Sequence, residues 1–341
     1  MPLGSSFPRA RGKLARGGVK HVDLQRMLAN CERDQWDVRD LDWSQAPRTM
    51  SPDDEAAIVQ LFTDMAGIER LAGALFAEQA KRAQDPTLRA IFQSFVKDEA
   101  RHAECARRLA AFYDVRKLRA YRQNESLARF FPHFLDAIRL LEDDVANIYV
   151  TGGELILDVA LLRSINDYVD DAMSAQAMRL INRDESRHIA IDYFMVDYYA
   201  SPDYVARLDG RARRTLRQRA NAWWSFGCVL YLAKPFFRDV FFGPMDRVDP
   251  AGDRLREAFK RIQLLGARPG NAERPFGKFM KALQDVYNHP QAGPLLGKVV
   301  ARIAGVEPRF MARLNSEDEI ARAAGMTMDA LAEEALAAKL H

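Results

Sequence analysis

Cysteine is scarce in this chain of 341 residues, and its placement excludes two classes of protein. The three cysteines, Cys31, Cys105 and Cys228, are odd in number and far apart in the sequence. They therefore provide neither a disulfide framework nor a paired CxxC zinc site. Because isolated cysteines persist as thiols in a reducing compartment, we expect a cytoplasmic protein.

An excess of charge of one sign is also missing, and so is a long uninterrupted apolar run. Fifty Lys and Arg residues stand against 47 Asp and Glu, and the net charge of +3 gives no reason to expect nucleic acid or an anionic membrane as a partner. The apolar run 223–233 is interrupted by Lys234 and Pro235 before it reaches the roughly 18 to 20 residues of a spanning helix. We therefore expect no transmembrane segment, and we interpret this run as a core or interfacial helix.

Strand patterns are absent, and helical periodicity dominates the chain. Two helix starts are marked by a capping residue and a proline, Ser51 before Pro52 and Asp85 before Pro86. The long helices are expected at about 51–82, 86–113, 133–166 and 170–199. The sequence thus predicts an all-α fold in which four long helices, with one long connection, form a bundle.

Composition divides the chain into three parts. Residues 1–48 form a basic N-terminal arm and a lead-in, residues 49–200 form the four-helix unit, and residues 201–341 form a helical C-terminal extension. The extension is expected to hold shorter helices near 253–266, 274–288, 293–304 and 317–339.

The extension begins with two segments of unusual composition. Arginines cluster between Arg207 and Arg219, and aromatic residues follow from Trp223 to Phe242. We interpret the arginines as a solvated face, with docking of an acidic carrier or a phosphate-bearing substrate as the alternative. The aromatic run is expected to be the core of the extension.

Two matching five-residue words carry the chemistry. Asp-Glu-Ala-Arg-His ends at His102, and Asp-Glu-Ser-Arg-His ends at His188. In each word a glutamate, Glu99 or Glu185, precedes the histidine by three residues, which places both side chains on one helical face. A single pair of this kind is typical of a solvated surface. Because the chain has only six histidines, two matching words on different helices indicate a shared metal site instead.

Glu69 lies at the same depth as the first word. It precedes the turn near Gln84 by 15 residues, and Glu99 follows that turn by 15 residues. At about 1.5 Å per residue both lie roughly 22 Å from the turn. Glu78 is only 6 residues from the turn and misses this level. Glu69 is therefore the candidate from the first helix.

Glu154 matches the second word in the same way. It precedes the turn near Tyr168 by 14 residues, and Glu185 follows that turn by 17. Glu154 also adjoins the almost wholly apolar stretch 155–162, where an unpaired carboxylate would be costly. Six residues are therefore predicted to ligate a pair of metal ions and to form the catalytic centre: Glu69, Glu99, His102, Glu154, Glu185 and His188.

This order of one glutamate, one ExxH word, one glutamate and one ExxH word resembles the ferritin-like superfamily of di-iron carboxylate proteins over residues 51–200. The 52-residue spacing from His102 to Glu154 is similar to that of the oxygenases and desaturases, and the DExRH words resemble those of soluble acyl-carrier-protein desaturases. The resemblance implies a ferritin-like four-helix bundle that holds two iron ions. Manganese or a mixed Mn/Fe pair stays open, because the same residues accept either metal.

The resemblance also implies a role for the first residue of each word. In the near two-fold arrangement of the superfamily, Asp184 orients His102 and Asp98 orients His188, each acid fixing the tautomer of a ligating ring. Ordinary exposed acids are the alternative. The arginine of each word is expected to brace these carboxylates.

Two departures from the superfamily narrow the class. Ala106 stands where radical-generating ribonucleotide reductase subunits usually carry a tyrosine, and Ile181 stands where the arylamine N-oxygenases carry a third histidine. The sequence therefore supports neither a radical-generating reductase subunit nor an arylamine N-oxygenase.

The expected function is that of an O2-dependent non-haem di-iron oxidase, either an oxygenase or a desaturase. Its substrate would be a small apolar or acyl-type molecule, free or carrier-linked, and an external reductase or ferredoxin would supply electrons. Residues such as Met65, Phe95, Leu157 and Ile181 are expected to line a dry pocket. Two alternatives are a ferroxidase or other metal-handling protein, and a non-catalytic helical scaffold with an idle metal site. A homodimer is left open.

Overall fold

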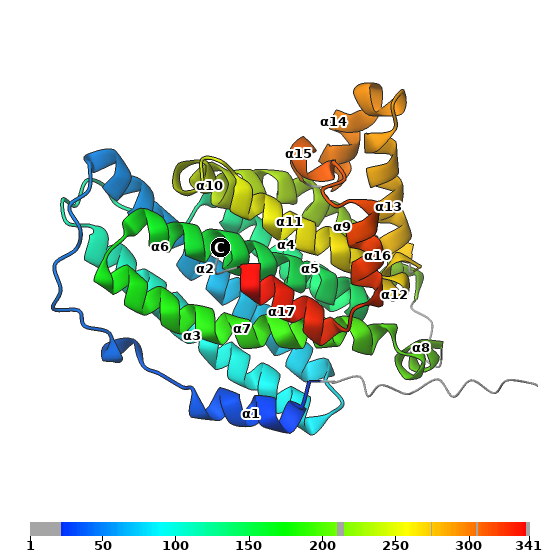
Figure 1. Cartoon of the computed structure of the whole chain (residues 1–341), viewed down its shortest axis with the longest axis horizontal. Helices are drawn as coiled ribbons and strands as arrows, with labels where there is room; N and C mark the ends of the chain where they lie inside the picture. The colour runs from blue at the N-terminus through cyan, green and yellow to red at the C-terminus, as the bar shows by residue number, and fades with distance from the viewer. Residues whose placement is uncertain (1–21, 210–214, 274, 305, 339–341) are drawn as a thin grey trace, which may run out of the picture.

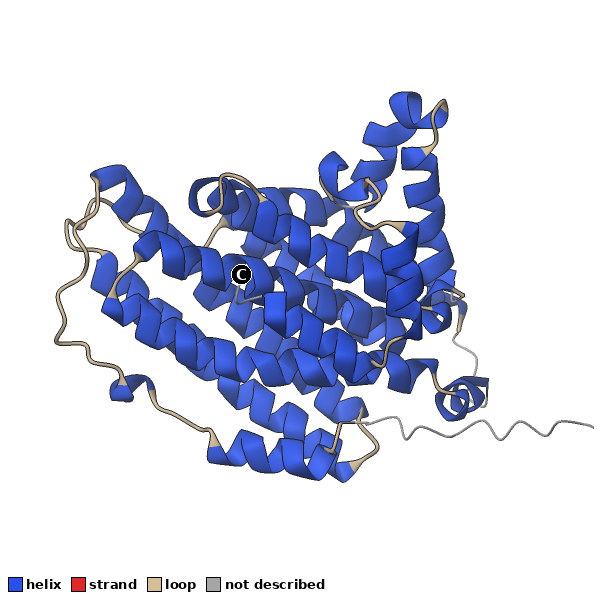
Figure 2. Cartoon of the chain, in the orientation of Figure 1, coloured by secondary structure: helices blue, strands red, loops and turns tan. Residues whose placement is uncertain are grey.

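The computed structural model describes residues 22–209, 215–273, 275–304 and 306–338. Helices and loops account for all of these residues, which contain no strand (Figure 2). The prediction of an all-α fold is confirmed. The basic arm up to Lys20, and Arg211, Arg213 and Arg214 of the arginine cluster, lie outside the described residues.

The first two long helices have the expected bounds. Helix α2 (Pro52–Arg82) and helix α3 (Pro86–Tyr113) run antiparallel and pack against each other (Figure 1). The Ser51 hydroxyl accepts the backbone N–H of Asp54, and the Asp85 carboxylate accepts two backbone N–H groups of the first turn of α3. These caps satisfy N–H groups that have no partner inside a helix, which is why both starts were predictable.

The third long helix differs from the prediction of a single helix over 133–166. The structure has α4 (Glu125–Leu140), α5 (Asp143–Leu155), the π-helical segment η2 (Ile156–Leu162) and α6 (Arg163–Val169). Asn124 caps α4 by accepting the N–H of Ser126. Arg82 holds the break after Leu140, because its guanidinium donates to the carbonyl of Ile138 and to Asp143.

The fourth long helix, α7 (Ala172–Ala200), begins slightly later than expected. The chain turns at Asp170, which has a left-handed φ of 48°, and Asp171 caps the helix by accepting the N–H of Ser174. Helix α7 packs against α5, and it also contacts α3. Gln79 of α2 donates to Asn147 of α5, so that the two antiparallel pairs enclose one buried centre.

The lead-in is ordered against these helices. Helix α1 (Leu24–Arg33) and the short helix η1 (Val38–Asp40) pack on α3, and α1 also contacts α7 (Figure 1). Cys31 of α1 is fully buried. The lead-in therefore forms part of the wall around the buried centre.

The extension packs on α4, on η2 and on α7. Its first elements are α8 (Pro202–Asp209), α9 (Leu216–Phe236), the π-helical segment η3 (Phe237–Phe242) and α10 (Gly243–Val248). They are followed by α11 (Asp253–Ala267), α12 (Pro269–Ala272), α13 (Pro275–Asn288), α14 (Ala292–Ala304), α15 (Pro308–Met311), α16 (Glu317–Gly325) and α17 (Met328–Ala338). Helix α9 packs on α4, whereas α11 and α17 pack on η2. The last expected helix, 317–339, is two helices separated by a capped turn at Met326.

The aromatic run is only partly core, which corrects the prediction. Phe236, Phe241 and Phe242 are buried, but Trp223 and Trp224 are 71% and 74% exposed. Only a narrow stripe of α9 faces α4, and the aromatic residues at the start of the run lie outside it.

One apolar stretch longer than 223–233 lies in the core. The segment Val145–Val169 is long and apolar enough to cross a membrane by length and composition alone. Its most apolar 18-residue window is 72% buried inside the protein, as in a core helix, so it is weak support for a membrane span.

Candidate metal centre

The structure brings the six candidate residues together at one level of the buried centre. Glu69 comes from α2, Glu99 and His102 from α3, Glu154 from α5, and Glu185 and His188 from α7. All six are buried, with at most 4% of any of them exposed. Depth counted along the two hairpins therefore predicted the common level of these six residues.

Their donor atoms form two overlapping sets. Glu69, Glu99, His102 and Glu185 offer atoms within 4.8 Å of one another, and so do Glu99, Glu154, Glu185 and His188. Glu99 and Glu185 belong to both sets. Two carboxylates shared between two sets of donors are what a pair of adjacent cations requires, so this group could bind metal ions.

Both histidines turn the same ring nitrogen towards the glutamates. Nδ1 of His102 lies 3.1 Å from Oε1 of Glu185, and Nδ1 of His188 lies 3.0 Å from both Oε1 of Glu99 and Oε2 of Glu185. The other nitrogen, Nε2, points away from the glutamates towards an aspartate. Nδ1 is therefore the donor atom that each ring would offer to a cation.

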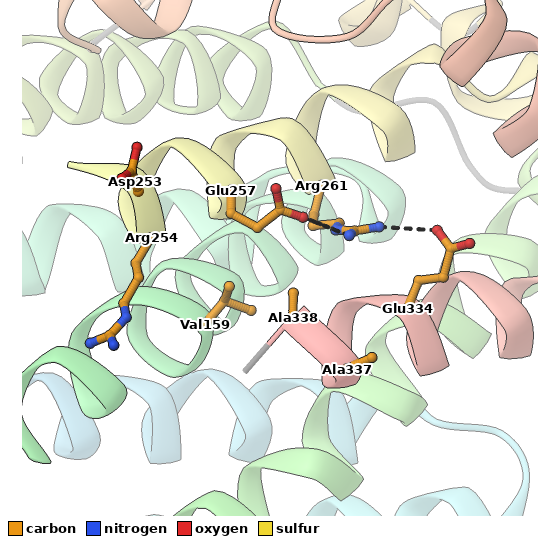
Figure 3. Close-up of a pocket in the computed structure, with 8 residues that line it drawn as sticks. All are labelled: Val159, Asp253, Arg254, Glu257, Arg261, Glu334, Ala337 and Ala338. Atoms are coloured by element: carbon orange, nitrogen blue, oxygen red, sulfur yellow. Dashed lines mark hydrogen bonds and ion pairs between the residues drawn. The ribbon is translucent and has the colours of Figure 1, made fainter. Parts of the chain in front are cut away.

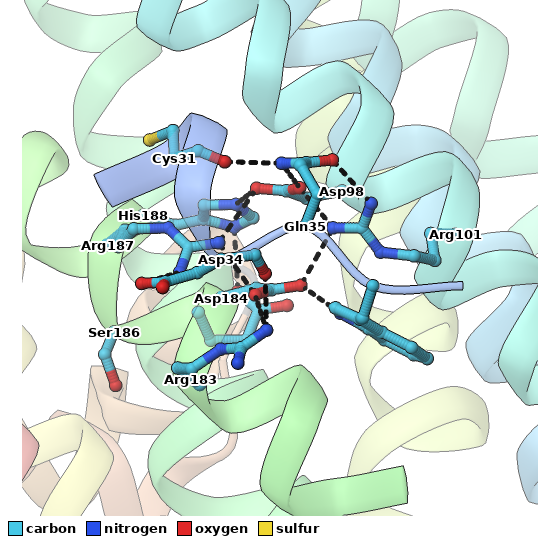
Figure 4. Close-up of polar contacts among 12 residues, drawn as sticks. Cys31, Asp34, Gln35, Asp98, Arg101, Arg183, Asp184, Ser186, Arg187 and His188 are labelled. Carbon is cyan, nitrogen blue, oxygen red and sulfur yellow. Dashed lines mark hydrogen bonds and ion pairs between the residues drawn. The ribbon is translucent and has the colours of Figure 1, made fainter. Parts of the chain in front are cut away.

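The two aspartates make the crosswise contacts that the resemblance implied. Oδ2 of Asp184 lies 3.1 Å from Nε2 of His102. Oδ2 of Asp98 lies 3.5 Å from Nε2 of His188, and Figure 4 shows this pair. Both aspartates are fully buried rather than exposed. Each word of the sequence thus supplies the acid that faces the histidine of the other.

Arginines brace both aspartates, as expected. Arg187 donates to Oδ1 of Asp184 at 2.7 Å, and Arg101 donates to Asp98 and to Oδ2 of Asp184 (Figure 4). Both guanidinium groups therefore contact the buried carboxylate of Asp184. Burial raises the pKa of each aspartate, but the contacts with His188 and His102 lower the pKa of Asp98 and Asp184 below the usual range.

Two residues of the lead-in complete this layer and were missed in the sequence. The indole N–H of Trp36 donates to Oδ2 of Asp184 at 2.7 Å, and the amide of Gln35 donates to Oδ1 of Asp98 at 3.3 Å. The rings of Trp36 and His102 stack with centroids 6.4 Å apart. No spacing rule links residues 148 positions apart, so the sequence carried no signal for the Trp36 contact.

Asp192 is a further buried acid that the sequence analysis did not select. It follows His188 by four residues on α7, so helical spacing was a signal that could have found it. Its side chain is fully buried, and neither carboxylate oxygen has a hydrogen-bond partner among the described residues. Burial raises the pKa of Asp192 well above its usual range.

Three of the four carboxyl groups of the centre have raised pKa values when no cation is present. Burial, with repulsion from Glu185, raises the pKa of Glu69 to about 7 and the pKa values of Glu99 and Glu154 well above their usual range. Burial acts on Glu185 too, but the positive charge of His188 holds its pKa well below the usual range. Cations would replace these protons.

The same carboxylates act on the histidines. Burial alone lowers a histidine pKa, but Asp184 and Glu185 raise the pKa of His102 to about 10. Glu185 and Asp98 raise the pKa of His188 to about 9. In the absence of a cation, both rings are therefore the positive partners of these acids.

Phe95 and Gly73 lie directly against residues of the centre. The expected pocket residues Met65, Phe95, Leu157 and Ile181 are all buried. The ring of Phe95 lies 4.1 Å from the His188 ring, centroid to centroid. A Cβ atom at Gly73 would lie 3.1 Å from Cβ of Glu99, so glycine allows α2 to approach α3 closely there.

A surface pocket of about 430 Å³ borders η2 (Figure 3). Val159 of η2 contributes an apolar wall, and residues of α11 and α17 form the sides. Arg261 pairs with Glu334 across it at 3.1 Å. None of the six candidate residues lines this pocket, but Val159 follows Glu154 by only five residues, and π-helical segments are frequent at functional sites.

Comparisons with known proteins add no assignment. No family model matches the sequence, and neither the curated proteins nor the solved structures include a significant match.

Proposed function

We propose that the protein is an O2-dependent non-haem di-iron oxidase, an oxygenase or a desaturase. In this proposal α2, α3, α5 with its continuation through α6, and α7 form a ferritin-like four-helix bundle. The observation that carries the proposal is the pair of overlapping donor sets with Glu99 and Glu185 in common. A structural salt-bridge cluster needs no such sharing.

The buried atoms of the centre fit a pair of divalent cations. No N–H or hydroxyl group of the described chain donates to either oxygen of Glu69 or to Oε2 of Glu154, although both residues are buried. Burying such atoms without a partner is costly. Four ionised glutamates carry a charge of about −4, which two divalent ions neutralise while the histidines bind as neutral rings.

Each residue of the centre would have a definite role in such an oxidase. The four glutamates and two histidines hold the metal pair, and Asp98 and Asp184 keep the proton on Nε2 so that Nδ1 is free to bind. When bound, a reduced iron pair supplies the electrons and open coordination positions that O2 reduction needs and that side chains lack. Manganese, alone or with iron, would satisfy the same residues. Phe95, Met65 and their neighbours exclude water.

The surroundings favour an apolar substrate. Phe95 lies against the His188 ring, and Met65, Leu157 and Ile181 are buried apolar residues, so the reacting part of the substrate would be a small apolar or acyl-type group. The pocket beside η2 has charged sides, at which the polar part of a carrier-linked substrate could dock. An external reductase or ferredoxin in the cytoplasm would deliver the electrons.

Metal analysis followed by O2 consumption tests the proposal. Protein produced with iron and manganese supplied should hold about two ions per chain. Glu99→Ala or His188→Ala should lose at least one of them, whereas Lys97→Ala, an exposed change next to the first word, should lose none. Protein that never holds iron or manganese would instead favour the scaffold alternative.

The second measurement separates an oxidase from a ferroxidase. Reduced protein should consume O2 slowly alone and faster with the right apolar or acyl compound. Rapid oxidation of many equivalents of added Fe(II) would overturn the oxidase proposal in favour of metal handling.

A further inference from the structure

Helix α9 exposes a face of large apolar residues that no described part of the protein covers. Its buried residues, Ser225, Val229, Ala233 and Phe236, form a single stripe at helical spacing that faces α4. On the opposite side, Leu216 is 82% exposed, and Trp223, Trp224 and Tyr231 are each exposed by more than 70%. Single exposed apolar side chains are common on protein surfaces. Four on one face of a helix form a continuous apolar patch, and such patches mark interaction sites.

The charge on this helix is of one sign. From Thr215 to Arg238 the sequence contains no Asp or Glu, whereas Arg217, Arg219 and Lys234 are exposed. Successive residues of a helix are rotated by about 100° around its axis. Arg217 and Arg219 therefore lie on the two sides of the exposed apolar stripe that contains Leu216. An apolar stripe with a basic border results.

Helix α14, which contacts α9, repeats the pattern. Leu295 is 82% exposed and Val299 is 55% exposed, and Leu296 and Ile303 extend the same side of the helix. Lys298 and Arg302 are exposed beside them, and no acidic residue occurs from 286 to 306. Helices α13 and α14 project from the upper right of the molecule in Figure 1.

We propose that the exposed faces of α9 and α14 dock the protein on an anionic lipid bilayer. Trp and Tyr concentrate at the headgroup level of membranes, and Arg and Lys lay their aliphatic stems on apolar surface while their charges meet lipid phosphates. A helix with one apolar face and a basic border lies in that interface rather than crossing it. The proposal does not depend on the metal centre.

Two other occupants fit the surface less well. A second copy of the chain related by a two-fold axis would bring this face against itself, and because residues 215–238 include no acid, basic residues would have only basic partners there. A nucleic acid would be recognised through phosphates and stacked bases, and the aliphatic side chains of Leu216, Leu295 and Val299 contribute to neither.

Sedimentation with lipid vesicles tests the docking surface. The full-length protein is mixed with vesicles of phosphatidylcholine alone or with phosphatidylglycerol added. We expect at least tenfold tighter partitioning onto the vesicles that contain phosphatidylglycerol, with a loss at high salt. Because only four tryptophans are present and two lie on this surface, their fluorescence should shift to the blue, and brominated lipids should quench it.

Variants identify the face. Trp223→Ser with Trp224→Ser should weaken vesicle binding at least tenfold, and Arg217→Glu with Arg219→Glu should remove the preference for phosphatidylglycerol. Val115→Ser with Leu118→Ser removes two exposed apolar residues elsewhere and should leave binding unchanged. Unchanged melting temperatures would show that all three variants fold.

Three results would overturn the proposal: no binding to phosphatidylglycerol vesicles at low salt, equal binding by the tryptophan variant, or a dimer in solution that the tryptophan variant breaks and that does not bind vesicles.

Discussion

Asp184 of α7 faces His102 of α3, with Oδ2 3.1 Å from Nε2, and the same oxygen accepts the indole N–H of Trp36 at 2.7 Å. Asp98 of α3 takes the corresponding place towards His188 of α7 at 3.5 Å. An ionised carboxylate can only accept, so Nε2 of each ring carries a proton, and Nδ1 is the nitrogen that would exchange its proton for a cation. The two words of the sequence are therefore coupled through their acids as well as through their glutamates.

Asp98→Asn and Asp184→Asn should each lower metal affinity about 10- to 100-fold. Asparagine keeps the shape but removes the charge that makes the ring a stronger donor. We expect the larger effect at Asp184, because its oxygen lies closer to the ring and because Trp36 holds it in place. Titration against a competing chelator measures the affinity, and melting of the metal-free protein reports any separate loss of stability.

The matched controls for these variants are Lys97→Ala and Arg179→Ala, which change exposed residues of the same two helices. Arg183, an expected outward-facing residue, is a poorer control because its guanidinium lies 3.7 Å from Asp184. Effects on metal affinity as small as those of Lys97→Ala would show that the aspartates do not act through the histidines.

The sequence predicted the parts of the fold that are determined locally. Ser51 and Asp85 cap their helices through backbone groups at most three residues away, and the level of Glu69 and Glu99 follows from counting along one hairpin. The break after Leu140 was not predictable, because it depends on Arg82, which is distant in the sequence. Trp36 was missed for the same reason.

The aromatic run shows a second limit. Hydrophobicity indicates that Trp223 and Trp224 favour an apolar surrounding, but not whether this chain supplies it. In α9 only the stripe that includes Val229 finds a partner in α4. The net charge of +3 did not reveal this surface either, because it is summed over the whole chain. Within that sum, α9 is a helix whose charged residues are all basic.

Trp36→Phe should lower metal affinity a few-fold and destabilise the protein by about 1 to 3 kcal/mol, because it keeps the stacked ring but removes a hydrogen bond to a buried charge. Trp43→Phe is the matched control. Its indole N–H also donates within the lead-in, to the carbonyl of Val38 at 2.7 Å, but that bond does not reach the centre. Competition with a chelator should show a lower metal affinity for Trp36→Phe than for Trp43→Phe. Identical affinities would contradict a role for Trp36 in holding Asp184.

Gly73→Ala should destabilise the metal-free protein by about 1 to 3 kcal/mol, because the new Cβ lies only 3.1 Å from Cβ of Glu99 and forces α2 and α3 apart. Gly153→Ala should instead increase the free energy of unfolding. No atom lies within 4 Å of a Cβ there, so alanine should gain about 0.5 to 1 kcal/mol of helix stability. Urea denaturation measures both values, and equal changes at the two sites would argue against close packing at Gly73.

Asp192→Asn should make the stability of the metal-free protein less sensitive to pH. Because burial raises the pKa of Asp192, the folded protein keeps a proton that the unfolded chain loses above pH of about 3.9. Stability therefore falls as the pH rises, by about 1.4 kcal/mol per pH unit from this group, until the pH passes its folded-state pKa.

Asparagine does not titrate. The free energy of unfolding of the variant, relative to that of the wild-type protein, should therefore increase steadily as the pH is raised from 5 to 7. Urea denaturation at each pH measures the difference. Asp197→Asn removes a carboxylate from the same helix at a partly exposed position and is the control for the substitution itself. A difference for Asp192→Asn that stays constant with pH would mean that Asp192 is ionised in the folded protein. A donor or a positive charge would then have to reach its carboxylate in solution, and the acid would belong to the charged centre rather than to its neutral wall.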